Sequence, residues 1–202
     1  MLSYLIFGIT YAFAAAVQPG PFLTYLISQT LSKGWRQTLP ACLAPLISDG
    51  PIIILVLLLL SQIPAWLVRF LHFGGAIFLF YLAAGSYKSW KNFNSEEKVE
   101  IKTSNQTLLK ATFVNILNPA PYLGWSLVMG PLFLKGYSET PLNGIALIIS
   151  FYTTLILTLA AIVFLFAFSR NLGPRVNKIT IGISVIALVC FGFYQLWIGI
   201  IS

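Results

Sequence analysis

Long runs without a charged side chain constrain this chain more than any other feature. No Asp, Glu, Lys or Arg occurs in residues 1–32 or in residues 142–169. A membrane-spanning helix takes roughly 20 apolar residues, so each run is long enough to cross a bilayer. Across the chain 58% of the residues are hydrophobic, 8% are charged, and the mean hydropathy is +0.87, which lies outside the range of soluble domains. The sequence therefore predicts an all-α integral membrane protein.

Polar breaks divide the apolar runs into six predicted transmembrane helices. They lie near residues 2–31, 39–60, 65–87, 108–134, 142–168 and 177–201. The longest polar segment, 88–107, carries charges of both signs and is expected to be a solvated cytoplasmic connector. No basic segment precedes the first apolar run, so the first helix is expected to stay in the mature protein.

Lysine and arginine are concentrated in alternate loops, and this predicts the orientation. The first, third and fifth loops and their borders hold ten of the twelve. The positive-inside rule places these loops in the cytoplasm, so both termini are predicted to be periplasmic or extracellular. The same distribution accounts for the net charge of +7 without a nucleic-acid partner.

A proline-rich motif occurs twice, one hundred residues apart. The first copy is Gln18, Pro19, Gly20, Pro21 and Phe22, and the second is Asn118, Pro119, Ala120, Pro121 and Tyr122. The duplication divides the chain into a first three-helix repeat, 1–87, the connector 88–107, and a second three-helix repeat, 108–202. Because three is odd, the second repeat must cross the membrane in the opposite direction, as in the inverted repeats of secondary transporters.

Each motif is expected to break its helix and start a new half-helix. Proline lacks a backbone N–H and suits the first turn of a helix, and Asn118 is a favourable N-cap. In inverted repeats the two half-helix N-termini would meet near the bilayer midplane. Their partial positive charge and free N–H groups favour an anion, so we expect the ten motif residues to bind a carboxylate. An ordinary kink at each motif is the alternative.

Asp49 is the only acidic residue in any predicted span. An unpaired charge at that depth costs at least a few kcal/mol, so the group is expected to be protonated, paired or facing water. It is a candidate for proton coupling or for binding an ammonium group; a purely structural hydrogen-bonding role is the alternative. Further residues are expected to line a cavity, namely Thr24, Tyr25, Ser48, Gly50 and Asn115. His72, near the outer end of the third helix, is expected to be an interfacial or packing residue.

The QPGP motif of the first helix, Asp49 with Gly50 in the second, and Asn118 with Pro119 in the fourth resemble the LysE/RhtB family of amino-acid exporters. The resemblance covers nearly the whole chain. It implies a six-helix protein of the bacterial inner membrane that exports amino acids or their derivatives, driven by the proton gradient. It also implies that these motifs form the translocation site. Ala120 stands where the family commonly has a lysine.

The sequence thus predicts an exporter of a small amino acid or derivative, working as a proton antiporter. Its expected partners are the solute, protons and the lipid bilayer, and a homodimer is left open. No cofactor is expected. Alternatives are export of a metal cation or another small solute, an intramembrane enzyme, and a membrane assembly protein without transport. One acid and the scattered Cys42 and Cys190 are too few ligands for a metal site, and the spans lack a nucleophile with a base.

Overall fold

The computed structural model describes residues 1–59, 65–91, 104–169 and 174–201, and these residues form helices without any strand. The all-α prediction is confirmed for this part of the chain. The elements are α1 (Leu2–Val17), α2 (Pro21–Lys33), α3 (Trp35–Thr38), the 3-10 helix η1 (Leu39–Leu43), α4 (Ala44–Leu59), α5 (Ala65–Lys91), α6 (Ser104–Ile116), α7 (Pro119–Gly124), the π-helix η2 (Trp125–Met129), α8 (Gly130–Glu139), α9 (Pro141–Ser169) and α10 (Pro174–Ile201).

Four segments of the described chain are long and apolar enough to cross a membrane. They are Trp35–Val56, Arg69–Lys88, Pro141–Phe168 and Lys178–Ile201. The pair α1 and α2, bent by 64° at its break, makes a fifth if it is counted as one span. The predicted fourth span, near 108–134, is not among them and is broken between α6 and α7, so the count of six helices stays a prediction.

The two ends of the predicted connector, 88–107, are helical. Residues 88–91 continue α5 and residues 104–107 begin α6, while 92–103 lie outside the described residues.

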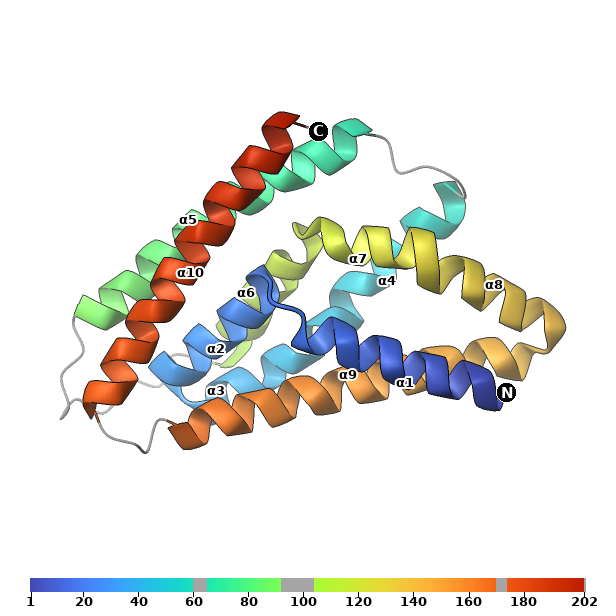
Figure 1. The fold of residues 1–202 in the computed structure, drawn as a ribbon, viewed down its shortest axis with the longest axis horizontal. Coiled ribbons are helices and arrows are strands. Elements are labelled where there is room, and N and C mark those ends of the chain that lie inside the picture. The colour runs from blue at the N-terminus through green and yellow to red at the C-terminus, as the bar shows by residue number, and fades with distance from the viewer. Residues whose placement is uncertain (60–64, 92–103, 170–173, 202) are drawn as a thin grey trace.

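Small residues let α1 pack closely along α9 (Figure 1). Tyr4, Gly8, Ala12 and Ala16 recur every four residues and are all buried, so they share one face of α1. A Cβ atom at Gly8 would lie 2.8 Å from the Leu147 carbonyl oxygen, too close for any side chain. This face therefore requires small residues where the two backbones approach.

A second pair of helices, α5 and α10, lies side by side on the other flank of the molecule (Figure 1). Gly192 of α10 faces Phe80 of α5, whose ring an added Cβ would meet at 2.7 Å. The two pairs are joined through α2, which contacts both α9 and α10. The space between these flanks holds the two proline motifs.

Candidate functional site

A cavity of about 580 Å³ lies between the α1–α2 break and the α6–α7 break. Helices α4, α5, α9 and α10 and the π-helix η2 complete its walls. Its volume falls within the range of roughly 300–1,000 Å³ that is typical of small-molecule sites. Most of its lining is apolar, with a small number of polar groups, as in such sites generally.

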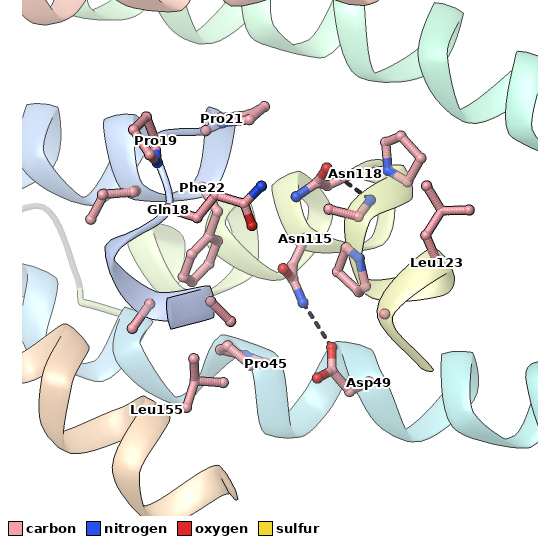
Figure 2. A pocket seen from close by; sticks show the side chains of 18 of the residues that line it. Gln18, Pro19, Pro21, Phe22, Pro45, Asp49, Asn115, Asn118, Leu123 and Leu155 are labelled. Atoms are coloured by element: carbon pink, nitrogen blue, oxygen red, sulfur yellow. Dashed lines mark hydrogen bonds between the residues drawn. The ribbon is translucent and has the colours of Figure 1, made fainter. Parts of the chain in front are cut away.

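Nine of the ten motif residues line this one cavity. They are Gln18, Pro19, Gly20, Pro21, Phe22, Asn118, Pro119, Ala120 and Pro121. Figure 2 shows the side-chain amides of Gln18 and Asn118 directed toward the space between the two breaks. Two proline interruptions one hundred residues apart therefore face each other, rather than forming separate kinks against lipid.

The remaining motif residue, Tyr122, stabilises the second break from outside the cavity. Its hydroxyl donates to the Ile116 carbonyl at 3.0 Å, and Tyr122 is not among the residues that line the cavity. Ile116 is the last residue of α6, so its carbonyl lies beyond the reach of intrahelical donors. In this structure Tyr122 closes the end of α6 through that hydrogen bond.

The second break is also tightly packed by α5. A Cβ atom at Gly75 would lie 2.9 Å from the Leu117 carbonyl oxygen, next to Asn118. The Asn118 side chain in turn accepts from the Ala120 N–H at 3.2 Å and caps α7, as expected of an asparagine at this position.

Asp49 lies on α4 in the wall of the cavity and is 4% exposed. Asn115 Nδ2 of α6 donates to its Oδ1 at 2.8 Å, and the Tyr152 hydroxyl of α9 donates to its Oδ2 at 3.0 Å. Ser48 donates to Oδ1 at 3.4 Å. The side chain of Trp125 makes a further polar contact with both Asp49 and Tyr152.

Every partner that the described residues give the Asp49 carboxyl group is uncharged. A buried carboxylate is stabilised by such donors, but its charge is not neutralised by them. A proton or an ammonium group is the kind of cation that would neutralise this carboxylate.

Four residues expected to line the cavity do not do so. They are Thr24, Tyr25, Ser48 and Gly50. Tyr25 is 0% exposed, and its hydroxyl reaches the Thr107 carbonyl at 3.4 Å, in the packed part of the bundle beyond the first turn of α2. Ser48 turns back to the Ala44 carbonyl at 3.0 Å, and Gly50 follows Asp49 by about 100° around α4. Asn115 does line the cavity.

The sequence arguments missed several polar residues, some in the cavity wall and one, Tyr152, next to Asp49. Tyr152 and Trp125 surround Asp49, while His72 and Gln195 line the cavity and hydrogen-bond to each other through Nδ1 and Oε1. His72 was expected to be an interfacial or packing residue, and it is 8% exposed inside the bundle. Their polarity could have identified these residues in the sequence, because buried polar groups in a membrane helix require partners.

Paired helix breaks around a cavity, with an acid in its wall, are typical of membrane proteins that carry solutes across the bilayer. The comparison with protein families identifies which of them this is. Residues 13–198 match the model of the LysE type translocator family, and the chain belongs to that family. It is a multi-pass membrane translocator, and the resemblance seen in its motifs is confirmed. Neither the comparison with curated proteins nor that with solved structures found a match.

Proposed function

We propose that the protein is a secondary transporter that exports a small amino acid or derivative across the bacterial inner membrane in exchange for protons. One observation carries the proposal: Asp49, with uncharged partners only, lines the cavity that both helix breaks share. A carboxylate can take up a proton or pair with an ammonium group.

The substrate carboxylate is proposed to bind between the two breaks. The first N–H groups of α2, at Phe22 and Leu23, have no acceptor within the helix, whereas Thr24 N–H already bonds to the Gly20 carbonyl at 3.0 Å. Gln18 and Asn118 add side-chain amides from both sides of the same space. These groups favour an anion at the positive end of the helix dipole.

Asp49 is proposed to hold the substrate ammonium and the proton in turn. One carboxyl group cannot neutralise both cations at once, so binding of one displaces the other. On the outer side a proton would displace the substrate, and on the inner side the substrate would displace the proton, so competition for the same oxygen atoms would couple the two as the repeats rock around the site.

The inverted repeat is supported by the pattern of helix contacts. A shift of one hundred residues relates α1 to α6, α4 to α9, and α5 to α10. Under this relation the contact of α1 with α9 corresponds to that of α6 with α4, and the α5–α10 contact corresponds to itself. We propose on this basis that the chain has six spans in two inverted halves, with both termini on the outer side.

Proteoliposomes with an imposed pH gradient test this function. The wild type is expected to show gradient-driven efflux of at least one radiolabelled amino acid, and Asp49→Asn is expected to lower that efflux on the order of tenfold or more. Ser150→Ala is the matched control, because Ser150 aligns close to Asp49 in the second repeat but bonds only to the Leu147 carbonyl.

Each alternative has its own result in the same vesicles. Transport of a metal cation or another solute in place of amino acids would favour the wider group of exporters. Equal efflux by the wild type and Asp49→Asn would remove the coupling role of the acid. Absence of any solute flux would favour a membrane assembly protein.

A further inference from the structure

The wall formed by α5 and α10 carries a buried polar pair that the proposed function does not use. His72 of α5 and Gln195 of α10 are 8% and 5% exposed, and they hydrogen-bond to each other. Both line the cavity, and His72 is the one described residue that α5 contributes to it. A long helix packed along the cavity thus presents a single side chain, and it is an imidazole.

This hydrogen bond leaves each side chain with unused polar atoms. With Nδ1 of His72 donating to Oε1 of Gln195, the neutral imidazole retains Nε2 as an acceptor, and the amide retains its NH₂ donors. No other described group bonds to either side chain. Among the described residues, some polar side-chain atoms are fully buried without a partner, and the free atoms of this pair do not belong to them. The pair therefore offers a donor and an acceptor to accessible space.

A role in holding α5 and α10 together does not explain why the pair lines the cavity. The two helices already approach closely at Gly192, and an added Cβ at Gly199 would lie 3.1 Å from the Cβ of His72. A single interhelical hydrogen bond adds only modest stabilisation in a membrane, and it needs no exposure to a cavity.

The pair lies on the flank opposite Asp49. Asp49 belongs to α4 and is bound to α6 and α9, whereas His72 and Gln195 belong to the α5–α10 pair (Figure 1). In the proposed function, Asp49 and the helix breaks take the ammonium and carboxylate of the substrate. The part of the solute that remains for the α5–α10 wall is its side chain.

We propose that His72 and Gln195 bind a hydroxyl or amide group on the substrate side chain and so select polar side chains over apolar ones of the same shape. The inference rests on the proposed function and names its substrate class: amino acids with an uncharged, hydrogen-bonding side chain. A site that hydrogen-bonds its substrate discriminates against an isostere that lacks the bond, because the polar groups of the protein are then left unpaired.

Shape-matched solutes test this selection. Vesicles containing the full chain are loaded with threonine or valine, and in a second series with asparagine or leucine, and initial efflux is measured under a pH gradient. The wild type is expected to move the polar member of each pair faster. His72→Phe and Gln195→Leu are each expected to lower the polar-to-apolar ratio by about two- to tenfold, the effect of one neutral hydrogen bond.

Two controls separate selectivity from structural damage. Tyr194→Phe removes the hydroxyl of another α10 residue that lines the cavity. Ser86→Ala removes a buried hydrogen bond of 2.9 Å between α5 and Ser28, away from the cavity. Both controls are expected to change absolute rates while leaving the ratio within twofold of the wild type.

The outcomes distinguish this inference from the proposed function. A ratio that His72→Phe and Gln195→Leu both leave unchanged, or a wild-type ratio of one or below, overturns the selective role while transport stands. If His72→Phe does not fold, the ratio for Gln195→Leu decides alone, with Gln195→Met as its length-matched repeat. A wild type that moves another amino acid but none of these four overturns the selective role and leaves transport standing, whereas a wild type that moves no amino acid at all overturns both proposals.

Discussion

The two proline motifs have the same spacing but start their helices at different residues. In the first copy, α2 begins at Pro21, the second proline. In the second copy, α7 begins at Pro119, the first proline. Three residues, 18–20, separate α1 from α2, whereas two residues, 117–118, separate α6 from α7.

The side chain before the first proline accounts for part of the difference. Asn118 accepts the Ala120 N–H and caps α7, whereas α2 has no side-chain cap at all. Its N-cap is Gly20, in an extended conformation with φ −172° and ψ 178°. The second break is further closed by the Tyr122 hydroxyl on the Ile116 carbonyl, a bond that Phe22 cannot make. The comparison teaches that side chains outside the prolines decide how open a break remains.

Substituting the residue before the first proline of each motif should distinguish the two breaks most clearly. Asn118→Ala is expected to destabilise the protein by about 1 kcal/mol, the usual effect of losing an N-cap, and Gln18→Ala by no more than a few tenths. Unfolding of the purified protein in detergent, followed by circular dichroism, measures both. Equal losses would show that Gln18 also supports its break.

Exchanging the two equivalent aromatic residues sharpens the same contrast. Tyr122→Phe leaves the Ile116 carbonyl without its donor and is expected to cost roughly 0.5–1.5 kcal/mol. Phe22→Tyr adds a hydroxyl to the first break, where no hydrogen bond like that of Tyr122 is expected, so the stability of the protein is not expected to rise. The same unfolding measurement applies, and a stabilising Phe22→Tyr would contradict the assignment of the first break as the open one.

The smallest expected effect is at Gly20. An added Cβ there meets nothing closer than the Gln18 carbonyl oxygen at 3.9 Å, and the extended backbone suits alanine. Gly20→Ala is therefore expected to stabilise the protein by about 0.4–1 kcal/mol through the unfolded state. Gly50→Ala, whose added Cβ also meets no atom within 4 Å, is the control for a glycine away from the breaks. A destabilised Gly20→Ala protein would mean that the first break needs glycine for its geometry.

The sequence predicted the features that have local causes. Two prolines in three residues disfavour a continuous helix, so both breaks could be placed, whereas the single Pro51 stays inside α4. The duplication of the motif predicted that the breaks would meet. Asp49 stood out because charge is rare at membrane depth, and Asn115, which was expected to line a cavity, lies in the wall of this one. The family resemblance rested on the same motifs.

What could not be predicted depends on how helices rotate against one another. Tyr152 reaches Asp49 only because of the packing of α9, and no local pattern distinguishes it from other tyrosines in the spans. Tyr25 does not line the cavity for the same reason, because the direction of its side chain depends on the residue at which α2 starts. His72 and Gln195 are 123 positions apart, and their contact follows from the α5–α10 pairing alone.

The hydrogen bonds of Asp49 tie three separate helices to two oxygen atoms. Asn115 holds Oδ1 from α6 and Tyr152 holds Oδ2 from α9, while the acid itself belongs to α4. A proton added to either oxygen converts an acceptor into a donor, and the neighbouring donor must then turn away or find another partner. Binding of one proton thereby changes hydrogen bonds to helices of both halves, with no need for a charged residue to move.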